Sequence, residues 1–325
     1  MRDSEKLLLS ICIPTFNRRE LLTRTLRSLE EGAPEVEVII GDNSDIQSNR
    51  DIIEKTLSSF QGKWTYIRNI PPVDPVSNVN KCIQKSISKY IYILHDDDFL
   101  LPGGLKTILK TLKDHPDQHI FSFGIKVVDI EENLINTEAV RKQEFLNPKK
   151  ALFNTLNNSS YIRMPSIIIS REAYDNVGLW DPQMEPSDDI EMFLRLFLKY
   201  PLLKIPDLVA AYTVHKGAWT EKIFNQKTIE VLMGIFNKVE KEKILDHKVF
   251  LTAKSNFFHQ FILGGAVREI KKGHFNKAQQ ILSLFSLMQL SSLPISKKWL
   301  PIKIIIWMLV KNAAFIRLFT KSKLI

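Results

Sequence analysis

The sequence has few of the residues and motifs that mark several common protein classes. Only two of its 325 residues are cysteine, Cys12 and Cys82, and both lie in apolar patterns. We therefore expect buried thiols in a reducing compartment rather than disulfides or zinc sites. It contains no G-x-G-x-x-G, P-loop, G-x-S-x-G or C-x-x-C motif. These absences argue against dehydrogenases, P-loop nucleoside triphosphatases, α/β hydrolases and zinc proteins.

Acidic residues are missing from the C-terminal segment, where no Asp or Glu follows Glu269. The basic residues of that segment are Lys271, Lys272, Lys277, Lys297, Lys298, Lys303, Lys311, Arg317, Lys321 and Lys323. The whole chain has a formal net charge of +9, so this tail carries +10 and the remainder −1. Because the excess belongs to one segment, it describes that segment only, and we expect no nucleic-acid partner.

No secretory signal is recognisable at the N-terminus. The apolar run at residues 7–13 stops at Pro14 and follows acidic residues, which favours a β-strand. Further apolar runs predict strands at 36–40, 65–67, 90–94, 120–129 and 166–170. Helical spacing predicts helices at 20–31, 51–60, 79–88, 105–113 and 188–200.

This alternation predicts an α/β fold with a mainly parallel sheet flanked by helices. Ligands of such sheets bind beyond the carboxyl ends of the strands, which points to residues 14–18, 41–45 and 95–99. From about residue 228 the pattern is purely helical. We expect a catalytic domain at 1–220, a helical appendage at 221–290 and a basic tail at 291–325.

Three consecutive carboxylates, Asp96, Asp97 and Asp98, follow the apolar run 90–94. They would raise one another's pKa unless a cation or hydrogen-bond donors compensate. Mg²⁺ and Mn²⁺ prefer oxygen ligands. If the strand continues, Asp96 and Asp98 share one side and one metal could meet both. The alternative is a solvated acidic turn.

A second acidic pair, Asp188 and Asp189, opens the predicted helix 188–200. One interpretation is capping, because acids favour helix N-termini and Asp188 with Glu191 would form a capping box. The other is a general base on a rigid platform, directed at an acceptor hydroxyl.

Four segments resemble family 2 glycosyltransferases with the GT-A fold. These are SICIPTFNR at 10–18, VIIGDNS at 38–44, DDD at 96–98 and SDDIEMFLRL at 187–196. They resemble the family's opening strand, its nucleobase-binding strand, its D-x-D motif and its E-D-x-x-x-x-x-R segment, respectively. The resemblance spans about residues 8–220, in the family's order and with similar spacing.

The resemblance implies the following roles. Nucleotide contacts would come from Pro14, Thr15, Phe16, Asp42, Asn69, Asp96 and Asp97. A divalent metal, Mn²⁺ or Mg²⁺, would be held by Asp96, Asp98 and His215. Asp189 would be the catalytic base, with Asp188 beside it, and His215 has a purely structural alternative.

Two positions depart from the family pattern. Ser77-Asn78 stands where relatives have Arg-Asn, so Lys81 is a candidate for the diphosphate contact. Asp188 stands where Glu is usual. Trp180 and Trp219 are candidates either for stacking on a sugar or for packing.

The resemblance implies a metal-dependent, inverting transfer of a sugar from a nucleotide-sugar donor, expected to be a UDP-sugar. The acceptor would be a hydroxyl of a glycan or a lipid-linked oligosaccharide. The alternatives are a metal-dependent nucleotidyltransferase and a catalytically inactive, membrane-tethered binding module.

The tail predicts peripheral attachment to a membrane. Its apolar stretch 304–310 is too short to span a bilayer and is bracketed by Lys303 and Lys311. Trp299 and Trp307 suit the depth of lipid headgroups. We expect a cytoplasmic protein bound through its tail to the anionic inner face of the cell membrane. A helix packed on the protein's own core is the alternative.

Overall fold

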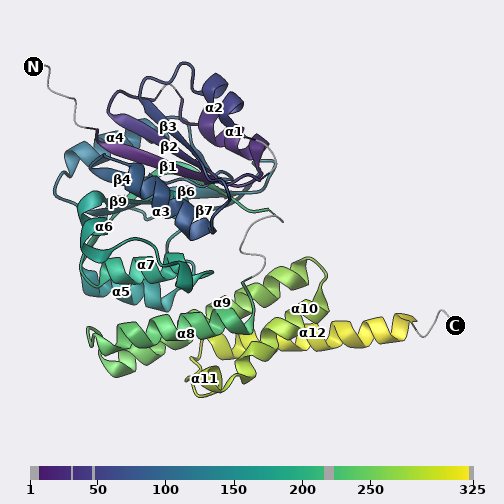
Figure 1. Cartoon of the computed structure of the whole chain (residues 1–325). Coiled ribbons are helices and arrows are strands. Elements are labelled where there is room, and N and C mark those ends of the chain that lie inside the picture. Colours follow the sequence, from purple (N-terminus) through teal and green to yellow (C-terminus); the bar gives the residue numbers. More distant parts are fainter. Residues whose placement is uncertain (1–6, 31, 46–47, 216–222, 322–325) are drawn as a thin grey trace, which may run out of the picture. The chain divides into compact units, whose positions relative to one another are not determined.

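The structure, a computed structural model, describes residues 7–30, 32–45, 48–215 and 223–321 (Figure 1). These residues divide into two compact units. The first contains the described residues of 1–151 and 162–218, and the second those of 152–161 and 219–325. The second unit therefore includes both the predicted appendage and the described part of the predicted tail.

The first unit is built on a ten-stranded sheet with strand order β3-β2-β1-β4-β9-β6-β10-β5; β7 pairs with β6, and β8 with β10. The strands are β1 (Leu9–Thr15), β2 (Val36–Asp42), β3 (Lys63–Arg68), β4 (Tyr90–Ile93), β5 (Phe99–Leu100), β6 (Ile120–Val128), β7 (Leu134–Glu138), β8 (Glu144–Leu146), β9 (Ile167–Ser170) and β10 (Leu202–Thr213).

Strands β3, β2, β1 and β4 are parallel, as the crossover pattern predicts. Beyond β4 the sheet is mixed, because β9 is antiparallel to both β4 and β6, while β6 and β10 are parallel. Two reversals restore the original direction, so β10 ends at the same edge as β1 to β4. The sequence pattern does not reveal β10, because Pro206 and Asp207 interrupt its apolar run at an irregularity in the strand register.

Helices pack on both faces of this sheet, with α1 (Arg19–Arg27), α2 (Arg50–Thr56) and α4 (Gly104–Asp114) on one face and α3 (Pro75–Lys85) on the other. The remaining helices before β10 are α5 (Pro148–Asn157, which extends into the second unit), α6 (Arg171–Val177) and α7 (Asp188–Phe197). Apolar side chains of α1, α2 and α4 pack on the alternate residues Leu9, Ile11 and Ile13 of β1. On the other face, α3 lies so close that a Cβ on Gly41 would meet Asn78 Oδ1 at 2.4 Å. The prediction of buried, unpaired cysteines is confirmed.

The second unit is helical, as the pattern after about residue 228 predicts. Its helices are α8 (Gln226–Lys241), α9 (His247–Lys271), α10 (Phe275–Ser283), α11 (Met288–Ser291) and α12 (Trp299–Lys321), with a 3₁₀ turn at Leu284–Ser286. An aromatic cluster of Phe236, Phe250, Phe257 and Phe258 joins α8 to α9. In the part of the chain that the structure describes, no helix is long and apolar enough to cross a membrane.

Candidate active site

The polar residues predicted at strand ends gather along one edge of the sheet. Thr15 is the last residue of β1, Asp42 is the last of β2, and Asn69 directly follows β3. Pro14 lies within β1, opposite Gly41 of β2. The edge is the one expected to bind ligands in an open α/β sheet.

The three consecutive carboxylates form a turn and not an extended strand. Strand β4 ends at Ile93, and the Asp98 amide donates to the His95 carbonyl at 3.1 Å. The expectation that Asp96 and Asp98 share one side of a strand is therefore wrong, because alternation requires extended backbone. The solvated-turn alternative is wrong as well, since Asp96 and Asp98 are only 4% and 1% exposed.

Residues from the end of β1 hold Asp96 and Asp97. Thr15 Oγ1 donates to Asp96 Oδ2 at 2.7 Å, and the Phe16 amide donates to the same oxygen at 3.3 Å. Arg18 bridges the two acids, with Nη1 at 3.1 Å from Asp96 Oδ1 and 2.6 Å from Asp97 Oδ2. The Phe16 ring is half-exposed at this point of the site.

Residues from the end of β10 hold Asp97 and Asp98. The Thr213 amide donates to Asp98 Oδ1 at 2.9 Å, and His215 Nε2 donates to Asp97 Oδ2 at 3.1 Å. Arg24 of α1 ties the two segments together, because its Nη2 donates to the Asp97 carbonyl and to Thr213 Oγ1. Three distant parts of the chain thus fix one turn.

These partners do not neutralise the three acids equally. Burial and the charge of Asp97 raise the pKa of Asp96 to about 6, against the opposing charge of Arg18. Burial acts to raise the pKa of Asp97, but the hydrogen bond from His215 and nearby positive charges bring that pKa below its ordinary value. Burial and the charge of Asp97 raise the pKa of Asp98 well above its ordinary value. The positive charge of Arg24 opposes this rise in the pKa of Asp98 but does not cancel it.

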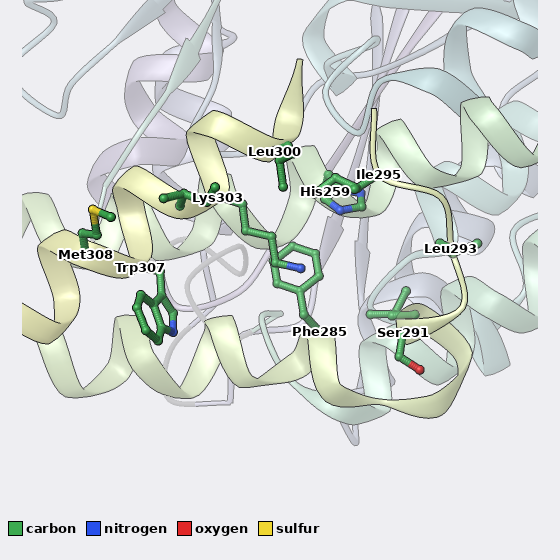
Figure 2. Close-up of a pocket in the computed structure, with 11 residues that line it drawn as sticks. His259, Phe285, Ser291, Leu293, Ile295, Leu300, Lys303, Trp307 and Met308 are labelled. Carbon is green, nitrogen blue, oxygen red and sulfur yellow. The ribbon is translucent and has the colours of Figure 1, made fainter. Parts of the chain in front are cut away.

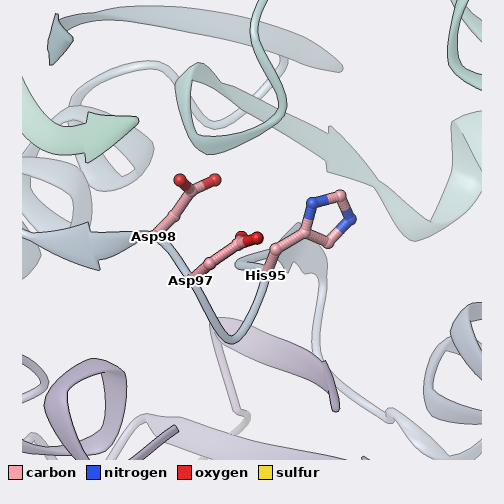
Figure 3. Close-up of side chains that lie close together, drawn as sticks. All are labelled: His95, Asp97 and Asp98. Carbon is pink, nitrogen blue, oxygen red and sulfur yellow. The ribbon is translucent and has the colours of Figure 1, made fainter. Parts of the chain in front are cut away.

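A divalent cation would balance the negative charge that the protein's own groups leave uncompensated at Asp98. Asp98 Oδ2 is buried and has no hydrogen-bond partner. Ligand atoms of His95, Asp97 and Asp98 lie within 4.8 Å of one another, and Figure 3 shows the three side chains on the same side of the turn. This donor set differs from the predicted one of Asp96, Asp98 and His215: Asp96 is engaged by Thr15, Phe16 and Arg18, and His215 contacts Asp97.

Asp42 is fully buried and orders the loop that follows β2. Its Oδ1 accepts from the Ser44 amide at 2.9 Å. Its Oδ2 accepts from the Asn49 amide at 3.1 Å and from the Tyr66 hydroxyl at 2.7 Å. Its predicted contact with a nucleobase stays a prediction, and both of its oxygens already have partners in the protein.

Asn69 belongs to a network of amide side chains beside Asp42. Its Nδ2 donates to Asn43 Oδ1 at 2.9 Å and to Asn78 Oδ1 at 2.8 Å. Lys81 Nζ donates to Asn69 Oδ1 at 2.7 Å, and Asn78 Nδ2 donates to the Gly41 carbonyl. Lys81, the candidate replacement for the family's arginine, thus lies beside a predicted nucleotide-binding residue.

Asp188 and Asp189 occupy the first turn of α7, and neither is its N-cap residue. Ser187 is the N-cap residue and its side chain makes no capping hydrogen bond, while Asp189 Oδ1 accepts from the Ile190 amide inside the first turn. Glu191 pairs instead with Arg195 at 2.8 Å. The capping-box interpretation is therefore wrong.

The pKa values of the two acids of α7 are both raised above their ordinary values. Burial and the charge of Asp189 raise the pKa of Asp188 to about 7. Burial also raises the pKa of Asp189, while the hydrogen bond from the Ile190 amide at 2.7 Å and the charge of Arg163 oppose the change. A carboxyl group whose pKa is raised toward neutral pH suits a general base.

The end of β10 connects the two acidic groups. Arg163, whose charge acts on Asp189, pairs with Glu138 at 3.2 Å and stacks over the Tyr212 ring with 5.1 Å to its centroid. The next residue, Thr213, binds Asp98. Among the described residues, no hydrogen bond or ion pair joins Asp188 or Asp189 directly to the turn at 95–98.

Several residues of the site carry no specific signal in the sequence. They are Arg24, Thr25, His95, Arg163 and Thr213. Thr25 Oγ1 donates to the carbonyls of Asp96 and Asp98, which depends on how α1 packs against the turn. Arg18 could have been found from its position just after β1, within the segment 14–18 that is expected to bind ligands.

Trp180 does not stack on a sugar. It is buried, its Nε1 donates to the Tyr174 hydroxyl at 3.3 Å, and its ring meets Phe193 edge to face at 6.3 Å. The packing alternative holds for Trp180. Trp219 lies outside the described residues.

Solved structures that share this fold are glycosyltransferases. Residues 1–349 of S. aureus TarS in complex with UDP match with a TM-score of 0.60 and 14% identity, over 94% of this chain and 89% of that one. The mannosyltransferase PcManGT of Pyrobaculum calidifontis in complex with GDP-Man and Mn²⁺ matches with a TM-score of 0.55 and 14% identity, over 97% and 88%. The fold is that of the GT-A glycosyltransferases.

The chain belongs to glycosyltransferase family 2, because the family model "Glycosyl transferase family 2" matches residues 10–178. An uncharacterised glycosyltransferase of Haemophilus influenzae is 24% identical over 247 residues, 74% of this chain and 81% of that one. The abequosyltransferase RfbV of Salmonella typhimurium is 30% identical over 111 residues, 33% of each chain. The protein is a glycosyltransferase, and the nucleotidyltransferase alternative is set aside.

The raised pKa of Asp188 predicts a stability that falls with pH. The folded state holds this proton up to about pH 7, whereas an unfolded Asp releases it near pH 4, so stability is lost as pH rises between these values. We expect Asp188→Asn to raise the melting temperature at pH 8 and to change it little at pH 4. Calorimetric scans at several pH values measure this. Asp175→Asn, at an exposed site on α6, should show no such trend, and a gain for Asp188→Asn that is equal at all pH values would contradict the account.

Proposed function

We propose that the protein is a metal-dependent, inverting glycosyltransferase that moves a sugar from a nucleotide-sugar donor to a hydroxyl group of a glycan acceptor. The observation that carries this proposal is the buried Asp98, whose Oδ2 has no hydrogen-bond partner. Asp98 contacts the end of β10, and the neighbouring Tyr212 contacts Arg163, whose charge acts on Asp189. The acidic turn at 96–98 would bind the donor, and the acidic pair of α7 would act on the acceptor hydroxyl. The catalytic part would be residues 1–220.

The donor side is proposed to be a UDP-sugar. TarS binds UDP and UDP-GlcNAc, whereas PcManGT binds GDP-Man. Pro14, Thr15 and Phe16 would line the nucleotide pocket, with the half-exposed Phe16 ring available for contact with the nucleotide. Asp42 and Asn69 would bind the nucleobase, Asp42 mainly by ordering the loop that follows β2.

A divalent metal, Mn²⁺ or Mg²⁺, would be held by Asp97 and Asp98 with help from His95. When bound, it would supply positive charge for the leaving diphosphate. Asp96 and His215, which we expected among the ligands, are better placed to position the turn: Asp96 fixes it to Thr15, and His215 orients Asp97. Arg18 supplies further positive charge at the same place.

Asp189 would accept the proton of the acceptor hydroxyl as that oxygen attacks the anomeric carbon. The bond from this carbon to the diphosphate breaks as the new glycosidic bond forms, so the configuration inverts. Asp188 would act beside Asp189 as the acid that holds a proton, because burial and the charge of Asp189 raise the pKa of Asp188 to about 7. Arg163 would keep Asp189 ionised when the site is closed to water.

The acceptor is proposed to be lipid-linked. A Campylobacter jejuni relative, 24% identical over 127 residues and 39% of this chain (40% of the relative), is a "GalNAc(5)-diNAcBac-PP-undecaprenol beta-1,3-glucosyltransferase". An acceptor of that chemistry resides in a membrane. We therefore propose that this protein works in the cytoplasm on the inner face of the cell membrane.

Helix α12 supports membrane attachment. Its buried residues Trp299, Ile306 and Val310 form one face, so the core-packing alternative holds for that face. Large apolar side chains on the rest of the helix are about half-exposed: Leu300, Ile304, Ile305, Trp307, Met308 and Leu309. Such a patch, in a part of the sequence that has ten basic residues and no acidic one after Glu269, favours an anionic lipid surface.

The metal proposal predicts the behaviour of Asp98→Asn. The amide oxygen can still accept from the Thr213 amide, but the negative charge is gone. We expect Mn²⁺ affinity, measured by electron paramagnetic resonance, to fall roughly tenfold or more. The metal-free protein should become more stable, because a buried charge has been removed. Unchanged Mn²⁺ affinity would rule out Asp98 as a ligand; Asp175→Asn is the control.

The base proposal predicts the behaviour of Asp189→Asn. The variant should fold and bind the donor normally but lose turnover by a factor of about 10² or more, the usual scale for a general base. Rates of sugar transfer at saturating donor provide the measurement. Turnover within a few-fold of the unmodified protein would return Asp189 to a structural role.

The attachment proposal predicts weaker lipid binding in the double variant Ile305→Gln, Leu309→Gln. Removal of two exposed apolar side chains should lower the affinity for phosphatidylglycerol vesicles by roughly tenfold or more. Co-sedimentation of the full chain measures this, with Ile87→Gln, exposed in the first unit, as the matched control. Equal binding to uncharged phosphatidylcholine vesicles would contradict the electrostatic part of the proposal.

A further inference from the structure

The second unit contains an apolar groove of about 480 Å³. This volume lies within the range of ~300–1,000 Å³ that is usual for small-molecule sites. The groove is lined by His259, Phe285, Leu290, Ser291, Leu293, Ile295, Leu300, Lys303, Ile304, Trp307 and Met308 (Figure 2). None of these eleven residues is acidic, and eight are apolar.

Lys303 brings a positive charge into this apolar setting. Its Nζ lies 3.8 Å from the centroid of the Phe285 ring, and Figure 2 shows the side chain reaching toward that ring. Within the described residues, Lys303 has neither an ion-pair partner nor a hydrogen-bond acceptor. Burial lowers the pKa of Lys303. An anionic group at this position would therefore gain a strong, partly desolvated contact.

His259 adds a hydrogen-bond acceptor to the same wall. It is 4% exposed, and its ring centroid lies 5.0 Å from that of Phe285. Its Nδ1 donates to the Ser255 carbonyl at 2.8 Å, which leaves the unprotonated Nε2 as an acceptor. Among the described residues, no side chain or backbone group bonds to Nε2. A hydroxyl group of a phosphate monoester could donate to it.

The groove opens at the exposed face of α12. Ile304, Trp307 and Met308 line it and are also about half-exposed. The part of the sequence after Glu269 contains ten basic residues and no acidic ones, and Lys303 and Lys311 belong to α12. A ligand that enters here would leave a cationic, apolar surface and contact an apolar groove wall with one ammonium group, that of Lys303. This chemistry matches a lipid that ends in a phosphate.

We propose that this groove binds the isoprenoid chain of a polyprenyl phosphate, with the phosphate on Lys303 and within reach of His259. The choice of a polyprenyl lipid rests on the proposed lipid-linked acceptor, whereas the groove's affinity for an apolar chain with a phosphate rests on its own residues. One cation beside one groove suits a single-chain lipid better than a two-chain phospholipid.

The test is direct binding of geranylgeranyl phosphate to the full-length protein by calorimetry, without donor sugar or metal. We expect geranylgeranyl phosphate to bind about tenfold or more tightly than geranylgeraniol, which lacks the phosphate. Lys303→Gln should abolish this preference, whereas Lys297→Gln, with the same loss of charge just before α12, should keep it. Ile304→Trp, a larger side chain at a half-exposed position, should weaken both ligands by narrowing the groove.

Three calorimetric results would overturn the proposal. They are equal affinity for geranylgeranyl phosphate and geranylgeraniol, equal losses of affinity in Lys303→Gln and Lys297→Gln, or binding of dioctanoyl phosphatidylglycerol as tight as that of geranylgeranyl phosphate. Because no sugar is transferred in this assay, its outcome is independent of the catalytic proposal. A protein that binds the lipid but transfers no sugar would refute only the function, and the reverse result would refute only the groove.

Discussion

The structure of the site depends on the cost of burying three adjacent carboxylates at the end of β4. Like charges at this spacing repel one another, and burial removes the water that would screen them. Arg18 from the segment after β1, Arg24 from α1 and the end of β10 all converge on this turn. Their contacts outweigh burial for Asp97, whose pKa is lowered, but the charge of Arg24 does not cancel the effect of burial and of neighbouring acids on Asp98, whose pKa stays raised. The negative charge left uncompensated at Asp98 makes the turn a candidate for a divalent cation and, with it, a diphosphate.

The same strand that completes the turn also organises the second pair of acids. Thr213 binds Asp98, while its neighbour Tyr212 supports Arg163, whose charge acts on Asp189. A single strand, β10, therefore positions both groups of the proposed mechanism: the turn that we propose binds the leaving group and the acid that we propose removes a proton. The end of β10 lies at the same edge of the sheet as the end of β1, because the two antiparallel pairings of β9 return β6 and β10 to the direction of β1.

The sequence predicts the parallel half of the sheet, its helices and the location of the site, because apolar runs and strand ends are local features. It does not predict β10, since Pro206 and Asp207 interrupt the pattern, and it misassigns the side-chain directions of Asp96 and Asp98 because the strand stops at Ile93. Contacts such as Arg24 with Thr213 and Arg163 with Glu138 depend on tertiary packing. The resemblance to family 2 predicts Asp189 as the base, and the structure shows that Asp188 is not the N-cap residue of α7.

The most direct test of the account is a screen of nucleotide sugars for release of the nucleoside diphosphate, with Mn²⁺, with Mg²⁺ and with a chelator. The account predicts that at least one donor, expected among the UDP-sugars, releases its diphosphate only when a divalent metal is present. Release that is equally fast in chelator would contradict the proposed role of the acidic turn. Release of pyrophosphate from a nucleoside triphosphate and a sugar phosphate, without any diphosphate from a nucleotide sugar, would contradict the assignment of glycosyl transfer itself.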